Sequence, residues 1–136
     1  MPWVAPGPFG AHITLQVECL GTGKIETASL HLKRAWIIGN HVLALDLAAS
    51  FVRCFAPPPD DGTYARVADS LWRLRDPEFL LAAKNADPNE SDELRCVHAF
   101  MGAPESAEVS TDFAHLSIGA VAREGDQVHY LDFDLQ

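Results

Sequence analysis

The stretch of sequence that decides the fold is LSIGAVAREGDQVHYLDFDL, residues 116–135. Apolar and polar residues alternate on both sides of Gly125-Asp126, and this period of two is typical of strands with one buried face. Because Gly and Asp favour tight turns, we predict an antiparallel hairpin that turns at Gly125-Asp126, with Glu124 facing Gln127. In the predicted register the apolar pairs are Ala120 with Leu131, Ile118 with Phe133 and Leu116 with Leu135.

The other face of the predicted hairpin is mostly polar. It brings together Val121, Gly119 and Ser117 from the first strand and Tyr130, Asp132 and Asp134 from the second. A slip of one residue would bury both carboxylates, which costs free energy when no partner is present. The alternation therefore predicts a well-specified register.

The N-terminal part of the chain also indicates extended structure. Residues 1–10 contain three Pro and two Gly, so we expect an extended arm without a regular element. Residues 11–19 alternate with a period of two and predict a strand. A second strand is predicted over residues 25–38, followed by a turn at residues 39–40 and a short returning strand over residues 41–45.

The middle of the chain is predicted to be helical. Asp46 is the predicted N-cap of a helix that stops before residues 57–62, a loop of three Pro followed by Asp-Asp-Gly. Apolar residues at helical spacing around Leu71 predict a further helix. Asp76, which precedes a proline, is a typical start for the next one. Residues 89–101 fit either a helix or a strand, and we favour the helix.

Together these elements predict one α+β domain over residues 1–136. Its sheet is mostly antiparallel and is built from the N- and C-terminal strands, with the helical middle packed on one face. Both hairpins are expected in one connected sheet, and the turn at residues 39–40 would set Trp36 opposite Leu43. The predicted core residues are Trp36, Leu43, Phe51, Leu71, Trp72, Ile118 and Phe133.

Composition limits the classes of function. The 136 residues carry 19 Asp and Glu against 10 Lys and Arg, a formal net charge of -9, which disfavours direct binding to nucleic acid. The sequence has no basic leader and no apolar run of about 20 residues, so we expect a cytoplasmic protein that does not enter the membrane. Three widely spaced cysteines predict free thiols, with Cys54 packed among apolar neighbours.

Local motifs do not define a catalytic or cofactor site. The residues 21–24, Gly-Thr-Gly-Lys, lack the rest of a phosphate-binding loop and are interpreted as a hairpin turn. Six histidines are scattered without the i, i+4 spacing of a helical zinc site, so no metal and no cofactor are predicted. If the protein is an enzyme, His31 and His115 are the weak candidates for acid–base catalysis.

The candidate partner-binding residues lie on the polar face of the closing hairpin. Asp132 and Asp134 are about 7 Å apart along one strand, and Tyr130 adds an aromatic side chain of the kind enriched at protein interfaces. Such carboxylates fit a cation, an acid–base pair or a basic partner. A solvated sheet face is the commoner reason for such a pair, because antiparallel sheets usually alternate apolar residues inward with polar residues outward.

Two main classes of function fit these observations. The first is a protein-binding module of the inhibitor, immunity or adaptor kind, which uses Tyr130, Asp132 and Asp134 against a protein partner with a basic surface. The alternative is a small enzyme or ligand-binding protein with a pocket between sheet and helices and with His or Asp acid–base chemistry. A third possibility is a homodimer that has no other specific partner. Since no complete catalytic motif is present, we prefer the first class.

Overall fold

The described residues form a six-stranded sheet with helices packed against one face. The computed structural model describes residues 2–4, 13–19, 21–57, 62–102, 106–123 and 125–135. The strands lie in the order β1-β2-β3-β6-β5-β4, and every neighbouring pair is antiparallel. The strands are β1 (Pro2–Val4), β2 (Ile13–Cys19), β3 (Ile25–Lys33), β4 (Ala107–Ser110), β5 (Ala114–Arg123) and β6 (Asp126–Leu135). The helices are α1 (Arg34–Gly39), α2 (His41–Phe55), α3 (Thr63–Arg73), α4 (Pro77–Asn85), the 3-10 turn η2 (Pro88–Glu90) and α5 (Asp92–Phe100).

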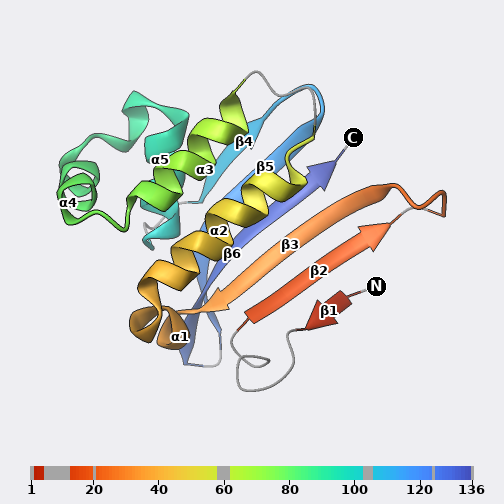
Figure 1. Ribbon diagram of the computed structural model, residues 1–136, viewed down its shortest axis with the longest axis horizontal. Helices are drawn as coiled ribbons and strands as arrows, with labels where there is room; N and C mark the ends of the chain where they lie inside the picture. The colour runs from red at the N-terminus through yellow and green to blue at the C-terminus, as the bar shows by residue number, and fades with distance from the viewer. Residues whose placement is uncertain are drawn as a thin grey trace.

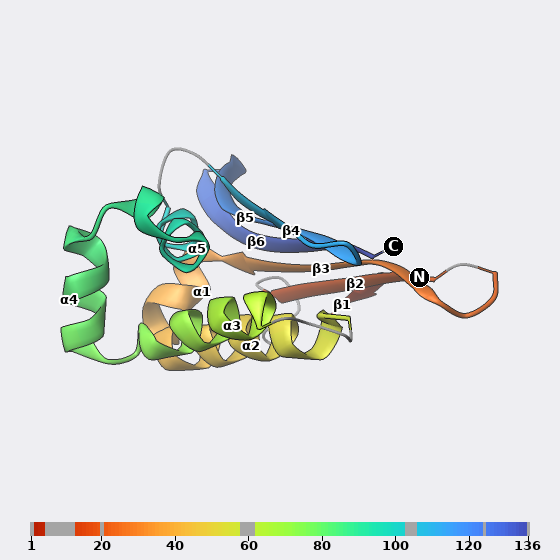
Figure 2. The ribbon, with the colours of Figure 1, turned by 90° about the horizontal axis from the view of Figure 1, so that it is seen from above.

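The helices come from the middle of the chain. α2 and α3 lie side by side across one face of the sheet (Figure 1), and the view from above has no described helix on the other face (Figure 2). α5 packs against β4 and β5, and α4 lies beside α5 at one end of the molecule. The predicted α+β class, with a helical middle on one face of an antiparallel sheet, is confirmed.

Strands β3 and β6 join the two ends of the chain in the centre of the sheet. Leu30 of β3 faces Leu131 of β6, and Ala28 faces Phe133. All four side chains are buried between the sheet and the helices. The β2–β3 hairpin and the closing hairpin therefore belong to one connected sheet.

The N-terminal segment is more regular than expected where the structure describes it. Pro2–Val4 form the edge strand β1, which pairs with β2, whereas residues 5–10 of the predicted arm lie outside the described residues. The strand predicted over residues 11–19 is confirmed as β2. Gly23 in the turn to β3 has a φ of 85°, so the Gly-Thr-Gly-Lys stretch belongs to a hairpin turn, as predicted.

The closing hairpin is present, but its register differs from the prediction by two residues. Gly125 has a φ of 83° and Arg123 faces Asp126, so Asp126 belongs to the strand rather than to the turn. Leu116 consequently faces Phe133. Because side chains alternate with a period of two, a shift of two residues leaves every side chain on its predicted face.

The side chain of Asp126 gives a physical reason for this difference. Its carboxylate accepts hydrogen bonds from the backbone N–H groups of Gln127, at 2.8 Å, and Ala35, at 3.2 Å. The second bond caps the start of α1, where Lys33 at the N-cap position makes no side-chain cap. A carboxylate is favoured there because it satisfies a free N–H at the positive end of the helix.

Two helices occupy residues 34–55, where the sequence predicted the end of a strand, a turn at residues 39–40 and a returning strand. β3 stops at Lys33, α1 follows directly, and α2 begins at His41. The residue between them, Asn40, donates a side-chain hydrogen bond to the backbone oxygen of Trp36 at 3.0 Å. This bond closes a corner between two helices instead of a hairpin turn, so the strand predicted over residues 41–45 is wrong.

Two further expectations at this corner are also wrong. Leu43 is 46% exposed, so it is not a core residue. Asp46 lies inside α2 rather than at its N-cap, and it accepts a hydrogen bond from the Ser50 hydroxyl at 3.4 Å. The other predicted core residues are buried or half-buried: Trp36, Phe51, Leu71, Trp72, Ile118 and Phe133.

Helices α3, α4 and α5 confirm the helical middle. The side chain of Asp76 caps α4, and that of Ser91 caps α5, each at 3.1 Å from a first-turn N–H group. The segment over residues 89–101 is therefore mainly helical, as favoured. Pro57 follows the end of α2, and residues 58–61 of the predicted loop lie outside the described residues. None of the helices in the described ranges has the length and apolar character needed to cross a bilayer.

One hydrophobic cluster fills the space between the sheet and the helices. The buried ring of Tyr64 meets Phe133 edge-on, with centroids 5.1 Å apart. Its hydroxyl donates toward the backbone oxygens of Val109 and Ala114, at 3.1 and 2.9 Å. These contacts tie α3 to the β4–β5 hairpin. Buried side chains on both sides of residues 57–62 belong to this cluster.

The three cysteines are free thiols, but the exposure of one differs from the expectation. Cys96 is buried in α5, and burial raises the pKa of its thiol to about 12. Cys19 and Cys54 are exposed. The expectation that Cys54 is packed is wrong, because residues 53 and 54 fall on the solvent side of α2.

Candidate functional site

The predicted partner-binding residues lie together on the face of the sheet that no described helix covers, called here the open face. Tyr130, Asp132 and Asp134 alternate along β6 with the buried Leu131 and Phe133. A groove of about 320 Å³ lies on this face. Its lining includes His31, Glu108, Ser117, Val121, Tyr130 and Asp132, whereas Asp134 is exposed beyond it.

Asp132 is paired with a histidine inside the groove. His31 Nε2 lies 3.3 Å from Asp132 Oδ1. The Tyr130 ring stands edge-on to this imidazole, with centroids 6.4 Å apart, and lies over Gly119. When His31 is protonated, it therefore balances the charge of Asp132 within the protein.

The second catalytic candidate, His115, occupies a different part of the open face. Its Nδ1 lies 2.5 Å from Ser110 Oγ, and its Nε2 lies 3.5 Å from Glu108 Oε1. A serine, a histidine and a carboxylate in contact can activate a nucleophile, but here Ser110 and Glu108 are exposed on a surface hairpin. Because His115 does not line the groove, the structure does not bring His31 and His115 into one site.

A second cavity lies on the helix-covered face, where α1, α4 and α5 meet the start of β6. This helix-side pocket has a volume of about 200 Å³. Its apolar lining consists of Ile37, Leu45, Leu74, Leu80, Phe100 and Met101. Its basic lining consists of Arg34, His41, Lys84 and His129, and no acidic residue of the described chain lines it.

His129 forms the buried polar part of this pocket. Its side chain is 4% exposed, and its Nδ1 lies 2.5 Å from the backbone oxygen of Phe100. Because a carbonyl oxygen can only accept, Nδ1 carries the proton and donates it. Nε2 is buried and has no hydrogen-bond partner among the described residues. The ring that lines the pocket therefore has one unsatisfied nitrogen, which is sealed from solvent.

Burial also determines the charge of His129. Removal from solvent lowers the pKa of its imidazole below the usual value, and the Arg34 guanidinium acts in the same direction. The hydrogen bond to Phe100, which is the second-largest effect, and the Asp126 carboxylate act in the opposite direction, but burial outweighs them. At neutral pH the ring is uncharged, so Nε2 is a hydrogen-bond acceptor.

The remaining basic side chains lie at the exposed edge of the pocket. Arg34, His41 and Lys84 are all exposed, in contrast to His129. Arg34 Nη1 donates to Gln127 Oε1 at 3.1 Å, which leaves other guanidinium N–H groups for a ligand. The pocket thus has a basic mouth and a buried, neutral imidazole in its wall.

Sequence reasoning did not single out His129 or this pocket. The alternation along β6 places His129 on the apolar face, with Leu131 and Phe133. A histidine at an apolar position was the available signal. The other lining residues come from α1, α2, α4 and α5, and their convergence depends on helix packing that the sequence pattern does not reveal.

Comparisons with known proteins identify no relative. No protein-family model, curated protein or solved structure matches the chain. Within the ranges that the structure describes, no three His, Cys, Asp or Glu side chains are grouped so as to hold a metal ion. The geometry of the two cavities is therefore the guide to function.

Proposed function

We propose that the protein binds a small organic molecule in the helix-side pocket. The observation that carries this proposal is the lining of the pocket, where apolar side chains surround a space bordered by Arg34, His41 and Lys84.

The size and lining of the pocket support the same proposal. Ligand sites are typically apolar cavities with a few convergent polar groups. An apolar cavity of about 150 Å³ is large enough to hold a benzene ring, and the helix-side pocket has a volume of about 200 Å³. The expected ligand is therefore one ring, or a branched chain of similar size.

A pair of neighbouring residues on α4 provides the test. Leu80 lines the pocket, whereas Leu81 is 63% exposed and does not. We expect ligand-observed NMR with a library of one-ring compounds to detect binding to the wild type and to Leu81→Trp. Leu80→Trp fills the pocket and should abolish binding. Equal binding to both variants, or no binding to the wild type, would refute the proposal.

A second candidate function is binding of a protein partner with a basic surface to the open face. It is supported by Tyr130 and Asp132 in the groove and by the exposed carboxylate of Asp134 beside it. Electrostatic complementarity would attract such a partner and would weaken with salt. The contact between Asp132 and His31 reduces this attraction whenever His31 carries a proton.

Matched charge variants test the second candidate. The double variant Asp132→Asn and Asp134→Asn removes two charges from the open face. Asp46→Asn with Asp69→Asn removes two exposed charges from α2 and α3, on the opposite face of the protein. We expect partners captured from lysate at low salt to be lost only with the first double variant. Equal capture by both double variants would exclude the open face as their binding site.

A further inference from the structure

The helix-side pocket separates apolar from charged side chains by depth. Leu45, Leu74 and Phe100 line it and are buried, whereas Arg34 and Lys84 line it and are exposed. A ligand that enters therefore meets basic side chains at the mouth and apolar side chains further in. The class of ligand follows from this order, and the inference rests on the proposed function.

The inner part of the pocket gives a ligand no side-chain hydrogen bond among the described residues. The Nδ1–H of His129 donates to the Phe100 carbonyl at 2.5 Å, and its Nε2 is sealed from solvent. The other inner side chains are aliphatic, aromatic or thioether groups: Ile37, Leu45, Leu74, Leu80, Phe100 and Met101. A polar group at the inner end of a ligand would lose its hydrogen bonds to water without replacement by these side chains.

The cations at the mouth have no carboxylate partner in the described part of the chain. Arg53, Arg66 and Arg95 each form an ion pair with an Asp or a Glu. In contrast, the hydrogen-bond partner of Arg34 is the uncharged Gln127, and none of the ion pairs among the described residues includes Arg34 or Lys84. Two positive charges at the mouth are therefore available to an anion.

The charge of the lining is opposite to that of the whole chain. The protein has 19 acidic against 10 Lys and Arg residues, yet no described acidic residue lines this pocket. Arg can bind a carboxylate through two N–H groups, and Lys adds a point charge. The mouth thus favours a carboxylate, while the interior favours a hydrocarbon.

We propose that the ligand is a small monocarboxylate with an apolar body. Its carboxylate lies at the mouth between Arg34 and Lys84, and its body fills the inner part of the pocket. The volume of about 200 Å³ suits one ring or a short branched chain. No polar group is expected at the end of the ligand that lies deepest in the pocket.

Three one-ring probes test this ligand class: benzoate, benzamide and 4-hydroxybenzoate. Benzamide has the shape of benzoate without its charge, and 4-hydroxybenzoate adds a hydroxyl at the inner end. We expect calorimetric titration of the wild type to show benzamide binding about three- to tenfold more weakly than benzoate, because ion pairs at exposed groups are modest. 4-Hydroxybenzoate should bind about tenfold more weakly than benzoate, since its hydroxyl is buried without a partner.

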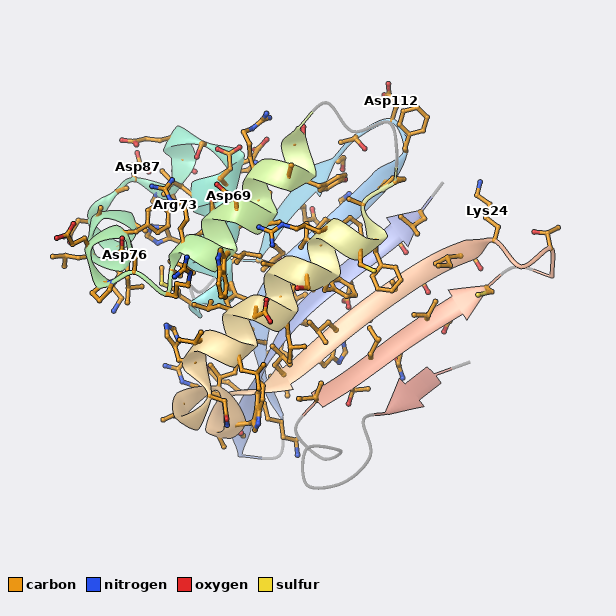
Figure 3. All side chains as sticks on the ribbon, in the orientation of Figure 1. Lys24, Asp69, Arg73, Asp76, Asp87 and Asp112 are labelled. Carbon is orange, nitrogen blue, oxygen red and sulfur yellow. The ribbon has the colours of Figure 1, made fainter. Side chains whose placement is uncertain are left out.

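The preference for benzoate over benzamide should depend on the basic mouth. It should fall as salt is added, because salt screens exposed charges. Lys84→Gln should lower the affinity for benzoate by about threefold and leave the affinity for benzamide unchanged. Lys24→Gln is the matched control and should change neither affinity, because Lys24 lies at the β2–β3 turn, at the opposite end of the molecule from α4 (Figure 3).

The outcomes separate this inference from the proposed function. If benzamide binds the wild type as tightly as benzoate, or if Lys24→Gln weakens benzoate binding as much as Lys84→Gln, the pocket does not select an anion. If 4-hydroxybenzoate binds as tightly as benzoate, the ligand does not need an apolar inner end. In each case the ligand class is wrong while a ligand pocket remains. If no one-ring compound binds the wild type or Leu81→Trp, the proposed function itself fails.

Discussion

The ring of Tyr130 lies directly on Gly119 of the neighbouring strand. A Cβ atom at residue 119 would come within 2.7 Å of the Tyr130 hydroxyl oxygen and 2.9 Å of Cζ. Such distances are shorter than van der Waals contact. The ring therefore occupies its place in the open-face groove only because residue 119 has no side chain, and the glycine shapes the groove.

Replacement of this glycine should displace the tyrosine. We expect Gly119→Ala to move the Tyr130 ring away from β5 and to lower the free energy of unfolding by about 1–3 kcal/mol, as overpacking does. Urea denaturation and the NMR shifts of Tyr130 and His31 would measure both effects. Gly21→Ala is the control, because nothing lies within 4 Å of a Cβ there, and it should leave the Tyr130 shifts unchanged.

The cap that Asp126 provides for α1 should be measurable. Asp126→Ala removes the acceptor of the Ala35 and Gln127 N–H groups, so the free energy of unfolding should fall by about 0.5–2 kcal/mol. Amide hydrogen exchange at Ala35 should accelerate. Asp112→Ala, at the exposed β4–β5 turn (Figure 3), removes the same charge without a helix cap. Similar losses in both variants would mean that the cap contributes nothing.

The stability of the protein should depend on pH through His129. Because burial lowers the pKa of His129 in the native protein, the unfolded chain binds a proton at this position more readily. The contribution of the neutral ring is complete above the ordinary histidine pKa of about 6.5. As the pH falls below that value toward the lower native pKa, the free energy of unfolding should fall.

A comparison with His129→Asn isolates this contribution, since asparagine does not titrate. The urea midpoint of the wild type should fall more than that of the variant between about pH 8 and about pH 5.5. The Arg34 guanidinium strengthens this pH dependence and the Asp126 carboxylate weakens it. Parallel pH profiles for the two proteins would show that the native ring accepts a proton as easily as the unfolded chain.

The three thiols should react in two classes. Cys19 and Cys54 are exposed, whereas Cys96 is buried and its thiol has a pKa raised to about 12. Since the thiolate is the reactive form, a thiol-specific chromogenic reagent should modify Cys19 and Cys54 quickly in the native protein. Cys96 should react only after denaturation. Mass spectrometry of peptides would identify the modified thiols. Rapid modification of Cys96 in the native protein would contradict its buried position in α5.

Much of the sheet could be predicted because period-two alternation records which face of a strand is buried. The helix at residues 34–39 could not, since Trp36 and Ile38 also fit the alternation of a strand. Its start depends on Asp126, a residue 91 positions away. The same contact explains the error in the hairpin register, because the sequence pattern counts Asp126 as a turn residue.

The two candidate sites also differ in how far the sequence alone could predict them. Tyr130, Asp132 and Asp134 share one strand, so alternation alone placed them on one face. The helix-side pocket combines His129 of β6 with Arg34, Lys84 and Phe100 from three helices. No local pattern encodes that convergence, although a histidine among the apolar residues of β6 marked the position.

The central place of β6 has a consequence for how the chain reaches its native state. Among the described strands β6 is made last during translation, yet it lies between β3 and β5. Until it emerges, β1-β2-β3 and β4-β5 are separate ribbons, each with an unpaired edge that invites aggregation. Pairing β6 with β3 closes a long loop and is slow for entropic reasons. The facing edges of β3 and β5 therefore stay unpaired until β6 is added between them.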